Sequence, residues 1–299
     1  MKLSIVIVSY NVQELLDKCL KSIYIASKNI DHEIYVVDNN SQDGTKELII
    51  NKHPRVRLIA NTHNIGFSKA NNQAIKFAKG EYVLILNPDT VLMPDTLVKM
   101  LKFMDQKDAK VAIATCKIEL PSGLLDRDCR RSFPTPARAL THFTGLSKIF
   151  RGTKIFDSYY MGYISINQET EVDACVGAFM FIRRKILKEV GNFDEDYFFY
   201  GEDLDLCYRI RQHNYKIFYT PITKIIHHKG ASSGIKKHSA ELSKAPEESK
   251  KRAIVESTHA MELFYKKHYK GKYPLFITFA VIIAIEIVKN IRLFRHNFL

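Results

Sequence analysis

Short runs of uninterrupted apolar residues recur through the first third of the chain. They lie at 3–9, 33–38, 56–60 and 82–87. Between the runs, apolar residues repeat every three or four positions, which is the spacing that places them on one face of a helix. This alternation predicts an α/β domain built on a doubly wound, mostly parallel sheet with right-handed crossovers.

Two of these predicted strands end in a carboxylate. The run YVLILN at 82–87 leads into Asp89, and the run at 33–38 ends in Asp38. A run without alternation is typical of a strand covered by helices on both faces. Such sheets bind nucleotides and other ligands at the C-terminal edge of their strands. Both carboxylates are therefore candidates for ligand contacts at one sheet edge, with helix capping as the alternative for each.

The second half of the chain has a weaker pattern. From about residue 121 to 170, Gly, Pro, Arg and aromatic residues replace the periodic apolar positions. A strand followed by a short helix returns at 172–184. We expect the region between to be an insertion that faces the substrate.

Composition indicates a globular, intracellular protein. Of the 299 residues, 46% are hydrophobic, which is enough for a substantial core. The five cysteines are odd in number and lack Cys-x-x-Cys spacing, so neither a disulfide framework nor a cysteine zinc site is indicated. The apolar run that follows Lys2 is too short for a signal peptide. A reducing, cytoplasmic location fits best.

The net charge of +13 is concentrated toward the C-terminus. Residues 1–206 hold 27 Lys and Arg against 26 Asp and Glu, whereas residues 207–299 hold 18 against 6. A nucleic acid, an anionic membrane surface or a solvated basic face would each explain such a tail. Composition alone leaves the three open.

The basic tail contains an apolar stretch, PLFITFAVIIAIEIV, at 274–288. A spanning helix needs about 20 apolar residues, and Glu286 interrupts this shorter stretch. Lysines precede it, and Lys289, Arg292 and Arg295 follow it. We therefore expect a helix lying in the membrane interface, or a shallow hairpin-like insertion. A helix packed on the rest of the protein and a dimer contact are the alternatives.

Two common nucleotide-binding motifs, GxGxxG and GxxxxGK[ST], do not occur in the sequence, so neither a standard dinucleotide fold nor a P-loop is supported. Seven other segments do occur, in the order SIVIVSYN, VVDNNSQDGT, NIGFSKANNQA, GEYVLILNPD, GAFMFIRR, GNFDEDYFFYGEDLDLCYR and HHKGASS. As a set, they resemble the inverting family 2 glycosyltransferases of the GT-A fold, and most of all the rhamnosyltransferase-type branch. The resemblance covers about residues 3–233.

The resemblance implies a set of residues that bind a nucleotide-sugar donor. In this chain they are Ser9, Tyr10, Asn11, Asp38, Asn40, Gly66, Asn72, Asn87 and Asp89. It implies that Asp38 binds the base of the nucleotide and that Tyr10 lies against the nucleotide. Gly66 and Asn72 are implied to line the donor pocket.

The resemblance also suggests why a buried strand leads into Asp89. Sugar transfer from a nucleoside diphosphate expels a diphosphate, whose negative charge is stabilised by a cation with hard oxygen ligands. Asp89 is implied to hold Mg²⁺ or Mn²⁺, although Asn87 stands where related motifs have a first aspartate.

A histidine is implied to complete the metal site. The spacing of His227 to Gly230 and Ser232 favours His227 over His228. Neighbouring residues of an extended segment point in opposite directions, so one of the two histidines at most should reach the ion.

The segment YGEDLDLCYR carries the acids Glu202, Asp203 and Asp205 at the start of a predicted helix. The helix dipole favours acids there, and capping alone could explain one of them. The resemblance places the catalytic base at Asp203, and we expect Glu202 to be its orienting partner.

The function expected from these features is inverting transfer of a sugar, with rhamnose as the first choice, in cell-surface polysaccharide synthesis. The donor would be a UDP-, dTDP- or GDP-sugar, and the acceptor a hydroxyl of a glycan or of a lipid-linked saccharide. A nucleotidyltransferase is the enzymatic alternative, although the Gly-rich basic loop such enzymes carry after the first strand does not occur here. A non-enzymatic nucleic-acid-binding protein is the other alternative, which the nearly neutral N-terminal part disfavours.

We therefore expect a GT-A catalytic domain at 1–235 and a basic, helical extension at 236–299. The extension would hold the protein peripherally on the inner face of the plasma membrane. A homodimer is a further possibility, and no nucleic-acid partner is expected.

Overall fold

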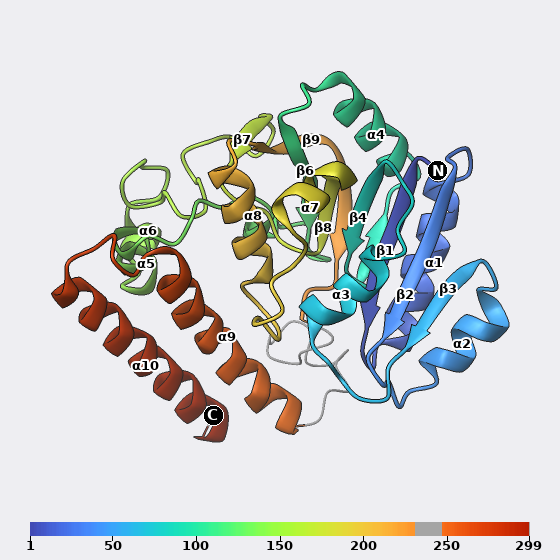
Figure 1. Ribbon diagram of the computed structural model, residues 1–299. Coiled ribbons are helices and arrows are strands. Elements are labelled where there is room, and N and C mark those ends of the chain that lie inside the picture. Colours follow the sequence, from blue (N-terminus) through green and yellow to red (C-terminus); the bar gives the residue numbers. More distant parts are fainter. Residues whose placement is uncertain (231–246, 299) are drawn as a thin grey trace.

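The computed structural model describes residues 1–230 and 247–298, and it is built around one nine-stranded sheet (Figure 1). In spatial order, eight of the strands are β3 (Val56–Ala60), β2 (His32–Asp38), β1 (Leu3–Ser9), β4 (Tyr82–Leu86), β8 (Phe179–Arg183), β6 (Val111–Glu119), β9 (Lys216–His227) and β5 (Thr90–Leu92). The ninth strand, β7 (Thr170–Val172), pairs with β9.

The four strands predicted in the first third of the chain are present and parallel. β1 lies between β2 and β4, and β3 pairs with β2. β8 is antiparallel to both of its neighbours, β4 and β6, while β6 is parallel to β9. The expected α/β fold is confirmed. Each antiparallel pair of the sheet includes β8 or β9.

Helices cover the sheet and extend beyond it. In chain order they are α1 (Gln13–Ala26), α2 (Thr45–Lys52), α3 (Phe67–Ile75), α4 (Thr96–Gln106), α5 (Pro136–Phe143), α6 (Leu146–Ile149), α7 (Arg184–Val190), α8 (Glu202–Gln212), α9 (Glu247–His268) and α10 (Leu275–Phe298). Every residue of β1 and β4 is buried, as their unbroken apolar runs predict. α1 contributes Leu16, Leu20 and Ile23 to this core, which are the positions at helical spacing.

The segment in which the periodic pattern fades has little regular structure. Within 121–170 it contains one short 3₁₀ turn, Arg127–Cys129, besides α5 and α6. A β-bridge between Arg131 and Ala174 joins this insertion to the segment that enters β8.

The last two helices form an antiparallel pair beside the sheet (Figure 1). The Tyr208 ring of α8 lies 5.6 Å from the Phe264 ring and 4.3 Å from the His268 ring of α9. Phe264, Tyr265 and Tyr269 are buried in this contact. α9 is therefore packed on α8, whereas the alternatives given for the stretch at 274–288 concern α10.

Apart from Pro274, the apolar stretch at 274–288 lies within α10, which is continuous from Leu275 to Phe298. The hairpin-like insertion is therefore wrong, because the stretch contains no turn. Among the described helices, none combines the length and the apolar character that crossing a membrane requires. The predicted domain boundary between 235 and 236 lies outside the described residues and stays a prediction.

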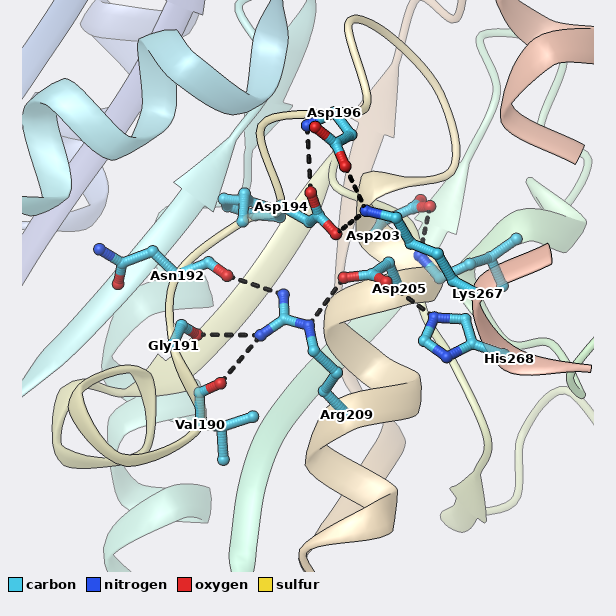
Figure 2. A network of polar contacts seen from close by, with 12 residues as sticks. Val190, Gly191, Asn192, Asp194, Asp196, Asp203, Asp205, Arg209, Lys267 and His268 are labelled. Atoms are coloured by element: carbon cyan, nitrogen blue, oxygen red, sulfur yellow. Dashed lines mark hydrogen bonds and ion pairs between the residues drawn. The ribbon is translucent and has the colours of Figure 1, made fainter. Parts of the chain in front are cut away.

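A buried polar network joins α9 to α8 (Figure 2). Asp205 Oδ1 lies 2.7 Å from His268 Nε2, and Asp205 Oδ2 accepts a hydrogen bond from Arg209 Nε at 2.7 Å. Arg209 also donates to the carbonyl oxygens of Val190 and Asn192. Burial raises the pKa of Asp205, but its contacts with His268 and Arg209 outweigh this and lower the pKa overall.

Lys267 makes a second, more exposed connection through ion pairs with Asp194 and Asp196 (Figure 2). Together with the Asp205 network, it fixes the end of α9 to the loop that precedes α8.

We predict that Asp205→Asn destabilises the protein by about 3–5 kcal/mol, because it leaves the Arg209 guanidinium without its buried carboxylate partner. The control is Asp196→Asn, whose side chain is 70% exposed and should contribute about 1 kcal/mol or less. Chemical denaturation at pH 7 measures both changes. The difference should shrink as the pH falls through the lowered pKa of Asp205, where this stabilisation is lost. Equal effects of the two variants at pH 7 would contradict the assigned role of the network.

Candidate active site

The ends of β1 and β2 present buried oxygen atoms at one edge of the sheet. The strands are paired so that Ser9 lies beside Asp38, and both side chains are fully buried. Asp38 Oδ2 accepts a hydrogen bond from Ser41 N at 3.1 Å. Within the described part of the chain, Asp38 Oδ1 and Ser9 Oγ have no hydrogen-bond partner. Because buried polar atoms are rarely left unpaired, these two oxygens indicate a place for polar groups of a ligand.

The loops that follow β1 and β2 are bonded to each other beside this edge. Asn11 N donates to Ser41 Oγ at 2.9 Å, and Asn11 Oδ1 accepts from Gln42 N at 2.8 Å. Asn11 and Asn40 have positive φ angles of 53° and 67°, in a region that asparagine adopts more readily than most residues. Tyr10, at the start of the first loop, is half-buried. The implied donor-binding residues of the two loops are thus neighbours, and their contacts with a donor stay a prediction.

Gly66 and Asn72 join α3 to the loop that precedes α8. Gly66 has a φ of 89°, and a Cβ atom there would lie 2.6 Å from the Phe198 carbonyl oxygen, so the backbone approach requires glycine. Asn72 Nδ2 donates to the Phe193 carbonyl oxygen at 2.8 Å, and Asn72 Oδ1 accepts from Phe193 N at 3.1 Å. These contacts give both residues a structural role, and their implied place in the donor pocket stays a prediction.

Strand pairing brings Asp89 and His227 together. β5 and β9 are antiparallel, with Thr90 opposite His227, and His228 N donates to the Asp89 carbonyl oxygen at 2.8 Å. His227 Nε2 lies 3.2 Å from Asp89 Oδ1 and 3.5 Å from Asn87 Nδ2. Asp89 and His227 are buried, whereas His228 is half-buried.

Asp126 lies behind the His227 ring, and it is not among the site residues predicted from the sequence. Asp126 Oδ2 is 3.0 Å from His227 Nδ1, and its other oxygen is paired with Lys229. Burial lowers the pKa of His227, but Asp89 and Asp126 outweigh this and raise it to about 9. A carboxylate on the far nitrogen is typical of histidines that bind metals through the near one.

The residues around Asp89 fit a cation that is shared with a bound diphosphate. Mg²⁺ and similar hard cations are commonly held by one or two carboxylates together with substrate phosphates and water. Asp89 and His227 would supply two ligands from the protein. In residues 1–230 and 247–298, no group of three or more His, Cys, Asp or Glu is arranged to hold a metal by itself. Ser232, the last residue of the histidine motif, lies outside the described residues.

Asp203 is held at the first turn of α8 by a buried ion pair. Its Oδ2 accepts from Arg131 Nη2 at 2.7 Å and from Gly177 N at 3.2 Å. Its Oδ1 accepts from Leu204 N at 2.7 Å. Arg131 is itself buried and comes from the 121–170 insertion, and the sequence analysis did not select it.

Glu202 has a different environment from its neighbour. It is buried, and its Oε2 has no hydrogen-bond partner among the described residues. Burial and the adjacent Asp203 raise the pKa of Glu202 to about 8, so it carries a proton at neutral pH. Asp205 belongs instead to the network with α9. Three acids within one turn of helix thus have three different environments.

Aromatic rings surround the Asp203–Arg131 pair on the side of the insertion. The Tyr159 and Tyr160 ring centroids are 4.7 Å apart, and His142 lies 5.4 Å from Tyr159. The Arg127 guanidinium lies 4.5 Å from the centre of the Tyr160 ring. These side chains form one cluster that joins α5 to Tyr159, which in turn contacts Arg131.

Residues 4–191 match the profile of glycosyl transferase family 2. The chain belongs to that family. It is 29% identical to rhamnosyltransferase WbbL of Escherichia coli K12, over 75% of this chain and 82% of the relative. It is 27% identical to an N-acetylglucosaminyl-diphospho-decaprenol L-rhamnosyltransferase of Mycobacterium tuberculosis, over 78% of each chain. The family 2, rhamnosyltransferase-type resemblance is confirmed, and the nucleotidyltransferase and nucleic-acid-binding alternatives lose their support.

Solved structures confirm the GT-A fold. The mannosyltransferase PcManGT of Pyrobaculum calidifontis, in complex with GDP-Man and Mn²⁺, matches with a TM-score of 0.55 at 18% identity, over 97% of this chain and 86% of its own. TarS 1–349 of S. aureus, in complex with UDP, matches with a TM-score of 0.54 at 17% identity, over 89% and 70%. At these identities the likeness concerns the fold alone.

We predict an order of Mn²⁺ affinities in the presence of a nucleoside diphosphate. His227→Ala should weaken Mn²⁺ binding most, and Asp126→Asn by about 10- to 100-fold through misorientation of the His227 ring. His228→Ala is the control and should bind nearly as the wild type does. Because His227 must lose a proton before it binds a cation, wild-type affinity should rise as the pH approaches 9. Calorimetric titration measures these affinities, and a larger loss in His228→Ala than in His227→Ala would show that the wrong histidine was chosen.

Proposed function

We propose that this family 2 glycosyltransferase moves rhamnose, with inversion, from a nucleoside diphosphate donor to a hydroxyl of a lipid-linked or other glycan acceptor in cell-surface polysaccharide synthesis. The observation that carries the proposal is the position of Asp89 against His227, at the sheet edge where Asp38 and Ser9 present unpaired oxygens. The names of the two relatives described above support rhamnose as the sugar.

The free oxygen of Asp38 suggests which bases the donor carries. A carboxylate accepts hydrogen bonds, so it favours a base with a ring N–H at its pairing edge. Uracil, thymine and guanine have such a group, whereas adenine does not. UDP-, dTDP- and GDP-sugars are therefore the donor candidates, with dTDP-rhamnose as the first choice.

Asp89 and His227 would hold Mg²⁺ or Mn²⁺, with Asn87 beside them. When bound, the cation supplies charge stabilisation for the diphosphate that leaves. Asp126 would accept a hydrogen bond from His227 Nδ1–H and keep Nε2 directed toward Asp89.

Asp203 is the proposed general base. It takes the proton of the acceptor hydroxyl while that oxygen forms a bond to the anomeric carbon of the sugar. The bond from the anomeric carbon to the diphosphate oxygen breaks on the opposite side, so one displacement inverts the configuration. Arg131 and Gly177 N orient the carboxylate, and Glu202, which is protonated at neutral pH, adds no second negative charge beside it.

The proposed acceptor is lipid-linked because the mycobacterial relative is named for a diphospho-decaprenol substrate. The protein would then work peripherally on the inner face of the plasma membrane. A homodimer stays a prediction.

Donor hydrolysis tests the proposed function without knowledge of the acceptor. Purified protein is incubated with UDP-, dTDP- and GDP-sugars, with Mg²⁺ or Mn²⁺, and release of the nucleoside diphosphate is measured. We expect one donor to be hydrolysed, and Asp89→Ala or a chelator to abolish that turnover while the variant stays folded, as circular dichroism would show. Full turnover by Asp89→Ala in excess chelator would remove the metal from the proposal, and hydrolysis of none of these donors would contradict the proposed donor class.

The assignment of the base has its own test. Asp203→Asn keeps the shape but removes the base, and should reduce transfer by about 100-fold or more while donor binding persists. Glu202→Gln should retain transfer within a few-fold, because glutamine resembles the protonated carboxyl that the raised pKa indicates. If Glu202→Gln is inactive and Asp203→Asn transfers sugar at nearly the wild-type rate, the base is Glu202.

A further inference from the structure

The outer helix of the C-terminal pair carries a long apolar face. Five large side chains of α10 are between 48% and 72% exposed, and they are Phe276, Phe279, Ile283, Ile287 and Ile291. They are three or four positions apart, so they form one stripe along the first two thirds of the helix, with the exposed Asn290 beside its end. We call these five residues the α10 stripe. Soluble proteins rarely leave so long an apolar surface uncovered, which makes it a candidate contact surface.

The stripe is not the packing face of α10. The side of the helix that contacts α9 includes Val281 and Ile282, which pack on the aromatic cluster of α9. Thr278 Oγ1 lies 3.1 Å from the Tyr265 hydroxyl, and Arg292 donates to Ser257 Oγ at 2.9 Å. The inner face is therefore satisfied within the protein, and the stripe remains for another partner.

The charges around the stripe indicate what that partner is. Lys270 and Lys272 precede α10, and its C-terminal half carries Lys289, Arg292 and Arg295, of which Arg292 faces α9. Glu286 is the one acidic residue of α10, and Lys289 pairs with it at 3.1 Å. A second copy of the chain would bring the same positive charges to the contact. An anionic lipid surface supplies the opposite charge together with an apolar interior.

We propose that the α10 stripe is an in-plane membrane anchor that lies on an anionic bilayer surface. The helix is buried to the depth of its large side chains, and the lysines and arginines at its ends contact lipid headgroups. The length of α10, its exposed apolar stripe and the basic residues near its ends suit this position. The inference extends the proposed function and depends on it in one respect, namely that the acceptor is lipid-linked.

The contacts of α9 make the anchor part of the catalytic unit. Ala260 packs beside Gly201, where an added Cβ would lie 3.0 Å from the Ala260 methyl group. The Arg252 guanidinium lies 3.8 Å from the centre of the Phe198 ring. His268 contacts Asp205 in the same turn of α8 as the candidate base (Figure 2). The helix pair thus holds α8 at a fixed distance from the surface on which the stripe lies.

A vesicle experiment with matched variants tests the anchor. The test variant is Phe279→Glu, Ile283→Glu and Ile287→Glu combined, at side chains that are 53–67% exposed. The control combines Ile50→Glu, Phe77→Glu and Val98→Glu, which introduce the same charge at side chains that are 52–66% exposed on other helices and loops. Co-sedimentation uses the full chain with vesicles of phosphatidylglycerol and phosphatidylcholine in equal parts, and with phosphatidylcholine alone.

We expect the wild type and the control to bind the anionic vesicles. The affinity of the stripe variant for these vesicles should be lower by about tenfold or more. Binding should decrease with salt and on phosphatidylcholine alone, because the basic residues contribute. Equal binding of the stripe variant and the wild type would overturn the proposal. So would a wild-type dimer in gel filtration that the stripe variant converts to a monomer while vesicle binding is unchanged.

Enzyme assays separate this inference from the proposed function. The stripe variant should hydrolyse the donor in solution at the wild-type rate, because its substitutions lie outside the active site. Its transfer to a lipid-linked acceptor in vesicles should fall, whereas transfer to a short-chain, water-soluble acceptor should persist. If the wild type binds vesicles through the stripe but hydrolyses no donor, the proposed function fails and the anchor stands. If the stripe variant loses donor hydrolysis in solution along with vesicle binding, the stripe serves folding and the anchor is contradicted.

Discussion

The pairing of the short strand β5 with the end of β9 is the contact on which the active site depends. It aligns Thr90 with His227 and places the adjacent Asp89 carboxylate 3.2 Å from the imidazole. Because side chains alternate along a strand, a shift of one residue would turn His228 toward Asp89 and remove His227 from it. Backbone register thus brings two segments more than 130 positions apart in the chain together at the proposed cation site.

The irregular insertion supplies one residue to the proposed cation site and one to the proposed general base. Asp126 orients His227 at the proposed cation site, and Arg131 orients Asp203 at the proposed base. Both insertion residues are buried, although their neighbours in sequence belong to loops. A change in this segment can therefore affect metal affinity and base geometry at the same time, since five positions separate the two residues.

The early strands and the carboxylates at their ends could be predicted because unbroken apolar runs mark buried parallel strands, and Asp38 and Asp89 follow such runs directly. Asp126 and Arg131 could not, because their partners lie about a hundred and about seventy positions away and no periodicity marks their segment. The packing of α9 on α8 was missed as a specific contact for the same reason: the pairing of His268 with Asp205 depends on tertiary structure. The apolar stretch of α10 was recognised in the sequence. The length of the helix and the face that it exposes could be seen only in the folded structure.

The central claim is that Asp89 and His227 hold the cation that a bound donor diphosphate completes. Anomalous X-ray diffraction from a crystal grown with Mn²⁺ and the nucleoside diphosphate of the donor tests it most directly. The account predicts one Mn²⁺ peak at about 2.0–2.3 Å from both an Asp89 carboxylate oxygen and His227 Nε2, with diphosphate oxygens in the remaining positions. A bound diphosphate whose Mn²⁺ lies away from Asp89 and His227 would contradict it.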